Sequence, residues 1–459
     1  MRRVLCLAIT AIATLAACGD DDPCDPAAQT GCDDGLVCEP VTDGDPACFA
    51  PVVVRGDVFD LGDASAIGGA RVVALDVNRA AASDVADSAA DGSYELWVPS
   101  TRAADGTPVG LELTLRADAD GYQSFPGGVR QALPIDTGTA VRDGDGAWVV
   151  DTVPTQIGLI GLPAGAGTGT LTGHVELPAG VGAIVVAETG AGPSARGYDA
   201  VVDRAGDFAI LNLPAGDFTV AAYAQGVVHE TADVTLAAGG TADVTLGLVA
   251  GAGAEVSGSV QIVNAPGGSV TSVVLFVEST FDENLARGAA PPGLRAGDVT
   301  GGFAIDGVPP GRYVVLAAFE DDLLVRDPDT CIAGTDIVHV EVADAPVVVD
   351  QSFKVTEALA ILSPADGAEV TGPPVFSWVD DSSEDLYRLR LFDSFGIEVW
   401  ATEIAGVSGS NPSVTYDGDP LQSGMYYQFR VQSVKTSGGG GNACELSQSE
   451  DLTGVFFVP

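Results

Sequence analysis

The chain contains only three histidines, His174, His229 and His339, and histidine is the side chain most often used for proton transfer or metal binding near neutral pH. None lies in a His-Glu-x-x-His arrangement, or beside cysteines at a spacing that would hold a catalytic zinc ion. The sequence also lacks the Gly-x-Ser-x-Gly turn of a nucleophilic serine and the glycine-rich loop that binds phosphates. We therefore predict no catalytic residues, no metal site and no cofactor, and interpret the histidines as structural.

Two aspartate-rich turns are the best candidates for a ligand. Asp118-Ala119-Asp120-Gly121 and Asp143-Gly144-Asp145-Gly146 each place two carboxylates two residues apart before a glycine, which is how a calcium-binding loop begins. Neither turn has the downstream glutamate that completes such a loop, and Arg116 stands where an earlier acid would help. Because Asp-Gly is also a common tight turn, a structural turn is the preferred interpretation, and calcium binding stays open as the alternative.

The first 17 residues have the pattern of an export signal. Met1-Arg2-Arg3 supplies positive charge, Val4 to Leu15 is a short apolar run, and two alanines stand directly before Cys18. The apolar run is far shorter than the roughly 20 residues that a membrane-spanning helix needs. Residues 1–17 are therefore predicted to be a signal peptide that is removed.

The end of this signal has a recognisable form. Leu15-Ala16-Ala17-Cys18 closely resembles the lipobox of bacterial lipoproteins, in which the cysteine sulfur receives a diacylglycerol and becomes the new N-terminus. The resemblance implies lipid attachment at Cys18 and the membrane as a partner, because two or more acyl chains give stable anchoring. Gly19 follows the cysteine where an aspartate would favour the inner membrane, so the resemblance implies the outer membrane of the cell envelope. An ordinary secretory signal that ends in cysteine is the alternative.

The composition limits the classes of partner. The chain has 64 acidic and 20 basic residues, a net charge of -44. Nucleic acid is excluded as a partner, because phosphate binding needs a basic face. The hydrophobic fraction of 46% excludes a disordered acidic tail, and 459 residues are too many for one core. We expect three or four folded domains with an acidic surface.

Residues 18–50 are predicted to be an acidic, cysteine-rich tether, because they lack a periodic apolar pattern. Apart from Cys6 in the signal and Cys18, the cysteines of the chain are Cys24, Cys32, Cys38, Cys48, Cys331 and Cys444. An even number in an exported chain predicts disulfides, but the four in the tether allow three pairings. A zinc site is the alternative there, although the tight Cys-x2-Cys spacing of structural zinc is missing. Cys331 and Cys444 are predicted to clamp the last two domains together, with two unrelated thiols as the alternative.

From residue 51 onward, three stretches repeat one pattern. Each begins with an apolar-x-Gly-x-Val strand, continues with a Val-rich strand, and then has a Gly-x-aromatic turn into a further strand. The first strands are Val54-Arg55-Gly56-Asp57-Val58, Leu171-Thr172-Gly173-His174-Val175 and Val256-Ser257-Gly258-Ser259-Val260, and the turns lead into Tyr94, Phe208 and Phe303. Alternation with period two and short Gly- and Pro-rich turns predict antiparallel sheets packed as sandwiches.

These repeats resemble the carboxypeptidase regulatory-like, transthyretin-like sandwich, a family of bacterial surface modules. Residues 168–250 and 253–357 match its pattern well, and residues 51–160 match only in their first half. The resemblance implies an all-β fold of tandem antiparallel sandwiches that act as accessory modules, used for spacing or for weak carbohydrate and protein contact. Gly161 to Gly169 and Gly438 to Gly441 are predicted to be flexible connections.

Residues 358–459 follow a different pattern. A strand that ends at Trp378 supplies an aromatic core residue, Tyr387 to Phe392 alternates cleanly, and Met425 to Val431 forms a late strand with a tyrosine placed for the corner bond of such sandwiches. Together these features resemble a fibronectin type III-like domain.

The leading functional hypothesis is a non-catalytic, lipid-anchored envelope or surface protein whose sandwiches serve as spacers and interaction modules. Envelope proteins and polysaccharide are the expected partners besides the membrane. Binding of carbohydrate or another polymer is the first alternative, and the aromatic fraction of 6% argues against it, because sugars stack on exposed aromatic rings. A calcium-dependent adhesin and an enzyme site assembled across domains are the others. The only lysines are Lys354 and Lys435, so the first two repeats have no lysine for an isopeptide bond.

Overall fold

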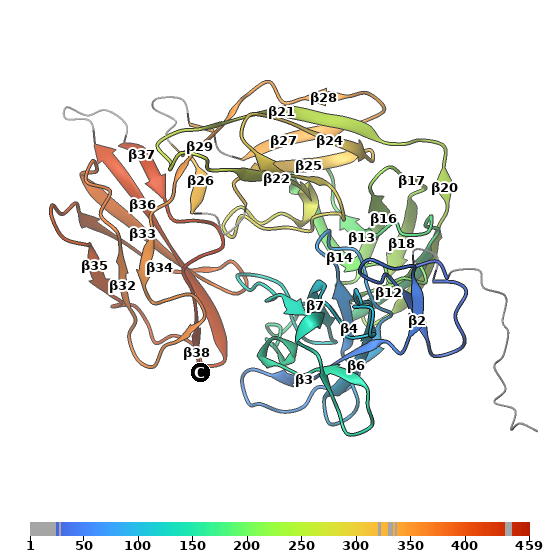
Figure 1. Cartoon of the computed structure of the whole chain (residues 1–459). Coiled ribbons are helices and arrows are strands. Elements are labelled where there is room, and N and C mark those ends of the chain that lie inside the picture. Colours follow the sequence, from blue (N-terminus) through green and yellow to red (C-terminus); the bar gives the residue numbers. More distant parts are fainter. Residues whose placement is uncertain (1–23, 27–28, 320–322, 329–333, 336, 437–442) are drawn as a thin grey trace, which may run out of the picture.

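A computed structural model describes residues 24–459 except 27–28, 320–322, 329–333, 336 and 437–442. Strands make up nearly all of its regular structure (Figure 1). The described residues contain no α-helix and four short 3₁₀ turns, η1 (Thr137–Thr139), η2 (Val153–Thr155), η3 (Gly192–Ser194) and η4 (Glu278–Thr280). None of the described helices is long and apolar enough to cross a membrane. The predicted all-β fold class is confirmed.

The described part of the chain begins with a module that contains a small hairpin and continues into four sandwiches. The hairpin pairs β1 (Val37–Glu39) with β2 (Ala47–Phe49), and we call residues 24–50 the cysteine module. Sandwiches 1 to 4 are defined here as residues 52–159, 169–249, 254–357 and 361–458.

The strands of sandwich 1 are β3 (Val52–Asp60), β4 (Arg71–Leu75), β5 (Ala86–Asp87), β6 (Ser93–Val98), β7 (Glu112–Asp118), β8 (Ile135–Asp136), β9 (Val141–Arg142), β10 (Trp148–Val150) and β11 (Ile157–Leu159). Those of sandwich 2 are β12 (Gly169–Val175), β13 (Ala183–Thr189), β14 (Arg196–Val201), β15 (Asp207–Leu213), β16 (Gly216–Ala224), β17 (Val228–His229), β18 (Ala232–Leu236), β19 (Thr241–Leu246) and β20 (Leu248–Val249). Those of sandwich 3 are β21 (Ala254–Ile262), β22 (Thr271–Val277), β23 (Arg295–Val299), β24 (Gly302–Val308), β25 (Gly311–Ala317), β26 (Leu324–Arg326), β27 (Val338–Val342), β28 (Val347–Val348) and β29 (Phe353–Glu357).

Sandwiches 1 to 3 share one topology. In each, the first strand pairs antiparallel with the strand that carries the Gly-x-aromatic turn and parallel with the last strands of the sandwich. The second strand pairs antiparallel with two neighbours in the opposite sheet. The sequence pattern covers only the first half of sandwich 1, yet β7 to β11 complete the same arrangement. The parallel pairs were not predicted, because the alternation within one strand does not reveal the direction of its neighbour.

The repeated glycine and the repeated aromatic residue are cross-strand partners. Gly56 lies opposite Tyr94, Gly173 opposite Phe208, and Gly258 opposite Phe303. A Cβ atom at Gly173 would come within 2.8 Å of the Phe208 ring and 2.1 Å of the Val244 carbonyl oxygen. The aromatic side chain therefore folds across its glycine, and each half of the motif requires the other.

Strand β22 departs from the expected alternation, because all seven of its residues are buried. Val273 and Leu275 point into the core of sandwich 3, whereas Val274 and Phe276 join a second cluster with Ala286 on the other face of the sheet. The segment that follows η4 therefore covers the outer face of this sheet. A strand buried on both faces reads as a continuous apolar run.

Sandwich 4 consists of β30 (Ile361–Ser363), β31 (Ala368–Glu369), β32 (Val375–Trp378), β33 (Leu386–Asp393), β34 (Glu398–Ala405), β35 (Ser413–Thr415), β36 (Met425–Thr436), β37 (Ala443–Gln448) and β38 (Val455–Val458). Trp378 is fully buried, and its ring meets the Tyr387 ring edge-on at 5.2 Å between centroids. The late-strand tyrosine that ties the corner is Tyr427, whose hydroxyl accepts a hydrogen bond from the Gln422 amide at 2.8 Å.

The sandwiches contact one another both in chain order and out of it. Sandwich 1 touches sandwich 2, since Arg116 Nη1 lies 2.6 Å from Asp199 Oδ2. It also touches sandwich 4, where Gln123 Nε2 donates to the Ser394 carbonyl oxygen at 2.7 Å. Figure 1 shows sandwiches 1 to 4 following one another around the molecule, from blue to red, so that the first and the last lie close together. The chain therefore folds back on itself instead of forming an extended row.

Candidate functional site

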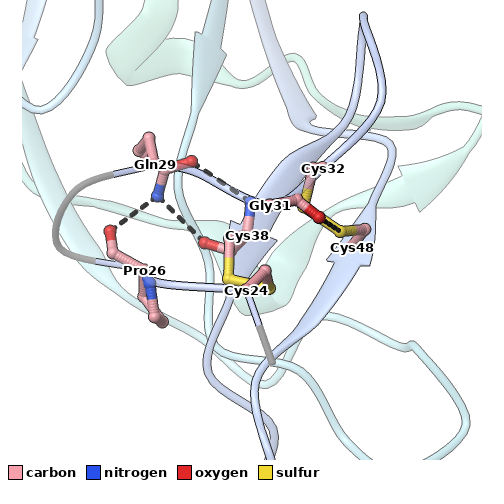
Figure 2. Close-up of a disulfide and its surroundings, with 7 residues drawn as sticks. All are labelled: Cys24, Pro26, Gln29, Gly31, Cys32, Cys38 and Cys48. Atoms are coloured by element: carbon pink, nitrogen blue, oxygen red, sulfur yellow. Dashed lines mark hydrogen bonds between the residues drawn. A yellow bond between two sulfur atoms is a disulfide. The ribbon is translucent and has the colours of Figure 1, made fainter. Parts of the chain in front are cut away.

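The cysteine module is held by two disulfides, Cys24–Cys38 and Cys32–Cys48 (Figure 2). Between them, Gln29 donates from Nε2 to the carbonyl oxygens of Pro26 (2.7 Å) and Cys38 (2.9 Å). Gly31 has a φ of +89°, and a Cβ atom there would lie 2.9 Å from the Cα atom of Cys24. The structure thus selects one of the three pairings that the sequence left open.

The disulfide bonds argue against the alternative of a zinc site in the cysteine module. The sulfur atoms of Cys24, Cys32 and Cys48 lie within 4.8 Å of one another, as a metal site would require. Each is bonded to another sulfur, however, and zinc is bound by thiolates. This cluster therefore crosslinks the chain and offers no ligand set.

A buried ion pair fixes the cysteine module to sandwich 1. Glu39 and Arg102 are 0% and 1% exposed, and the Arg102 Nε–H donates to Glu39 Oε2. The Ser100 amide donates to Glu39 Oε1 at 2.7 Å, and Arg102 Nη2 donates to the Ala50 carbonyl oxygen at 2.8 Å. Burial raises the pKa of the Glu39 carboxyl, although Arg102 and Ser100 oppose that change. Residues 24–50 are therefore a docked module rather than a free tether.

Sequence reasoning missed this ion pair. Glu39 and Arg102 stand 63 positions apart, and neither belongs to a motif. The only available sign was weak. Arg102 is one of just 20 basic residues in a strongly acidic chain, and it has no other basic residue beside it in the sequence.

The other predicted cysteine sites are only partly described. Cys18, the predicted site of lipid attachment, and Cys331 lie outside the described residues. Cys444, in β37, is disulfide-bonded. The predicted clamp between Cys331 and Cys444 stays a prediction.

The three histidines each use one ring nitrogen in a local contact. His174 Nδ1 lies 2.8 Å from Asp207 Oδ1, and His339 Nδ1 lies 2.6 Å from Glu278 Oε1. His229 Nε2 lies 2.9 Å from the Glu176 carbonyl oxygen. In the part of the chain that the structure describes, none of them makes a hydrogen bond to a serine, threonine or cysteine side chain. These contacts do not assemble a nucleophile with its base.

The first carboxylate of each aspartate-rich turn already has protein partners. Asp118 Oδ2 lies 2.9 Å from Arg116 Nε, and Asp118 Oδ1 accepts a hydrogen bond from the Ser124 hydroxyl. Asp143 Oδ1 accepts the amides of Asp145 and Ala147 at 3.0 Å, and Oδ2 lies 3.1 Å from Arg55 Nη1. Calcium would have to displace an arginine at either turn, so the geometry favours structural turns.

The Asp143 pKa agrees with this local bonding. Burial acts to raise it, but the Ala147 and Asp145 amides and the Arg55 guanidinium lower the pKa below its usual value. The carboxylate is thus held in its charged form by the turn itself.

A buried charge cluster joins three sandwiches. Asp451 is 1% exposed, and its Oδ2 atom pairs with Nη1 of Arg326 in sandwich 3. Its Oδ1 atom lies 3.3 Å from Nη1 of Arg430. Arg287 of sandwich 3 donates to the carbonyl oxygens of Gly128 in sandwich 1 (2.8 Å) and Asp451 in sandwich 4 (3.0 Å). Burial acts to raise the pKa of Asp451, but Arg326 and Arg430 outweigh it and lower the pKa. We call Arg287, Arg326, Arg430 and Asp451 the arginine junction.

Comparisons with known proteins identify no family. No protein family model matches the chain, and no curated protein is significantly similar in sequence. Among solved structures, a DUF3823 family protein from Bacteroides uniformis is 14% identical, with a TM-score of 0.22 and coverage of 45% of this chain and 100% of that one. The minor pilin GBS52 of Streptococcus agalactiae is 11% identical, with a TM-score of 0.17, and covers 43% of this chain and 99% of its own. A tetra-tandem repeat from the extending region of a large adhesion protein is 16% identical, with a TM-score of 0.14, covering 89% and 100%. Scores this low define neither the fold nor the function of the chain.

Proposed function

We propose that this chain is a non-catalytic lipoprotein of the cell envelope, anchored through Cys18 and more suited to the outer than to the inner membrane. The observation that carries the proposal is the Leu15-Ala16-Ala17-Cys18 sequence, followed within six residues by a disulfide-bonded module. Disulfides persist in oxidising compartments outside the cytoplasm, so the module and the export signal support each other.

We also propose family assignments for the sandwiches. Residues 51–160, 168–250 and 253–357 are taken as carboxypeptidase regulatory-like modules, and residues 358–459 as a fibronectin type III-like domain. The shared topology of sandwiches 1 to 3 and their common glycine–aromatic pair support the first assignment. The buried Trp378 and the Tyr427 corner support the second.

The sandwiches serve this protein as interaction modules rather than as a spacer. A spacer gains reach when its domains follow one another in a line. Here sandwich 1 contacts sandwich 4 through Gln123 and Ser394, and the arginine junction joins sandwiches 1, 3 and 4. This closed arrangement favours a compact molecule that presents its outer faces to envelope proteins or polysaccharide.

Metabolic labelling with radioactive palmitate tests the anchor. The full-length protein is expressed in a Gram-negative host, and label is expected in the wild type and in a Cys6→Ala control, because Cys6 is removed with the signal. Cys18→Ala is expected to lose the label and to accumulate as an unprocessed or freely soluble form. Label that persists in Cys18→Ala, or an unlabelled wild type, would contradict the proposal.

A further inference from the structure

Trp97 differs from every other aromatic residue of the chain. All tryptophans, tyrosines and phenylalanines lie among the described residues. Trp97 is 59% exposed, and every other one of them is buried or half-buried. Trp378 is buried, and Trp148 and Trp400 are half-buried beneath Arg142 and beside Tyr416. A large apolar ring left in water has no role in the core of its sandwich.

Trp97 begins a row of apolar side chains that crosses the outer face of one sheet. In register across β6, β3, β10 and β9 stand Trp97, Val53, Val149 and Val141. Val53 and Val149, in the middle of the row, are only 8% and 5% exposed. Trp97 and Val141, at its two ends, are exposed, and the exposed fraction of Val141 is 67%. Neighbouring strands lie about 4.8 Å apart, so the row extends across roughly 14 Å. We call these four residues the Trp97 platform.

A row of charged side chains runs beside the platform on the same face. Arg55 follows Val53 by two positions and pairs with Glu95 (Nε–Oε1, 2.5 Å) and Asp143 (Nη1–Oδ2, 3.1 Å). Arg55 and Glu95 are 38% and 56% exposed in their side chains, and the row holds one cation and two carboxylates. The face thus offers a flat ring and planar hydrogen-bonding groups side by side.

Among the described residues, none of the four platform residues shares a hydrophobic cluster with another sandwich. Sandwich 1 meets sandwich 2 through Arg116 on β7, which belongs to its opposite sheet. β6 is an edge strand that pairs with β3 alone. Trp97 and Val141, the two exposed ends of the platform, are therefore part of the outer surface of the closed molecule.

We propose that the Trp97 platform binds a neutral polysaccharide, with the indole ring stacked on the apolar face of a sugar ring. The neighbouring Arg55 and Glu95, whose side chains are partly exposed, then exchange hydrogen bonds with sugar hydroxyls. The ligand class follows from charge, because a net charge of -44 repels nucleic acid and anionic polymers. A protein partner fits less well, since a stable interface buries roughly 800 Å² per side and this row presents only two exposed apolar side chains.

This inference names a ligand class for the proposed interaction role, but it does not depend on the lipid anchor. Binding is measured with the purified full-length mature protein in detergent, whether or not Cys18 carries lipid. The palmitate experiment and the binding experiment therefore fail independently.

The test is retention by defined neutral polysaccharides. The probes are insoluble cellulose and chitin in sedimentation assays, and amylose and a β-1,3-glucan in native affinity gels, with alginate as the anionic comparison. We expect retention by at least one neutral polymer, and Trp97→Ala is expected to weaken it by at least about tenfold, as loss of a central aromatic contact does. Trp97→Phe, which keeps a flat ring, is expected to retain most of the binding.

Leu133→Ala is the matched control, because Leu133 has a similar exposure of 61% in the same sandwich and lies outside the platform strands. It is expected to bind as the wild type does, and unchanged circular dichroism spectra exclude unfolding of the variants. The proposal is overturned if no neutral polymer retains the protein, if alginate is preferred, or if Trp97→Ala and Leu133→Ala behave alike.

Discussion

The Arg102–Glu39 ion pair is the contact that decides whether the cysteine module stays docked. Both side chains are essentially inaccessible to water, and the pair is completed by Ser100 and Ala50. A buried pair adds little stability over an apolar substitute, but a buried charge that loses its partner is strongly destabilising. Removing one member of the pair is therefore expected to cost more stability than replacing both members with uncharged side chains.

Arg102→Met is expected to lower the free energy of opening of β1 by roughly 3–5 kcal/mol, because it leaves Glu39 buried without a counter-charge. Native-state hydrogen exchange of the β1 amides measures this. The double variant Glu39→Gln/Arg102→Met is expected to recover part of the loss. Arg390→Met, which removes an exposed pair with Glu398, is the control and is expected to change stability by about 1 kcal/mol or less. Equal effects of the two single variants would show that burial of the pair is unimportant.

Asp385 gives a prediction about pH. Lys435 Nζ at 2.7 Å and the hydroxyl and amide of Thr436 at 2.8 Å lower its pKa to about 2, from 3.8. Since the folded pKa is the lower one, the stabilisation is present above pH 3.8 and is lost as the pH falls through about 2. The difference in melting temperature between the wild type and Asp385→Asn is therefore expected to shrink across this interval.

Lys435→Met supplies the independent comparison, because it removes the largest cause of the shift. Its Asp385 carboxyl is expected to titrate closer to 3.8 when followed by NMR. A difference in melting temperature that stays constant down to pH 2 would rule out the assigned pKa.

At the scale of the element, the glycine–aromatic pair is a packing contact that the three sandwiches of shared topology have in common. Gly173→Ala is expected to destabilise sandwich 2 by about 1–3 kcal/mol, because the new methyl group meets the Val244 carbonyl oxygen and the Phe208 ring. Thermal unfolding of the full chain measures the effect. Gly267→Ala, in a loop with no atom within 4 Å of the added methyl group, is the control and should leave the melting temperature nearly unchanged. A similar loss in both variants would refute the packing argument.

The strands themselves were largely predictable, and their partners were not. Ser93 to Val98 alternates exposed and buried residues as its sequence suggests, because one face of β6 meets the core. The parallel pairing of β12 with β19 joins residues about 70 positions apart, and no local pattern records it. The alternation also places Trp97 on the outer face of β6, but it does not tell whether another part of the chain covers that face.

At the scale of the whole molecule, the arginine junction holds the sandwiches in their closed arrangement. Asp451→Asn is expected to remove the carboxylate that binds both Arg326 and Arg430, and with it the negative charge that compensates the largely buried Arg430. Such a loss destabilises by roughly 3–5 kcal/mol, which is enough to separate domain contacts. Small-angle X-ray scattering is expected to give a radius of gyration near 23 Å for the wild type and a clearly larger value for the variant.

Glu445→Gln is the control for the junction, because Glu445 pairs with Arg388 on a partly exposed face of the same sandwich. It is expected to leave the radius of gyration unchanged. A compact Asp451→Asn variant would mean that the remaining contacts, such as Gln123 with Ser394, suffice to close the molecule.

Closure was beyond sequence reasoning for a physical reason. The apolar periodicity that predicts a sandwich describes what each domain buries within itself. Contacts between sandwiches combine isolated polar residues such as Gln123, Arg287 and Asp451 with apolar clusters that cross a boundary, such as Val129, Leu285 and Phe392. Neither kind of contact has a periodic pattern of its own in the sequence. The glycine-rich segment 161–169 suggested loose connections, and its composition gives no sign of the contacts formed elsewhere.

The docked cysteine module would set how far a protein anchored at Cys18 can stand from a bilayer. Only five residues separate Cys18 from Cys24, and a fully stretched chain of that length reaches about 20 Å. With the module fastened to the first sandwich by Glu39 and Arg102, acyl chains on Cys18 would keep that sandwich among or just above the lipid headgroups. An acidic protein held so close to the membrane would be repelled by the negative charge of the lipid headgroups. Magnesium or calcium ions in the medium would screen this repulsion and so set the distance between the first sandwich and the membrane surface.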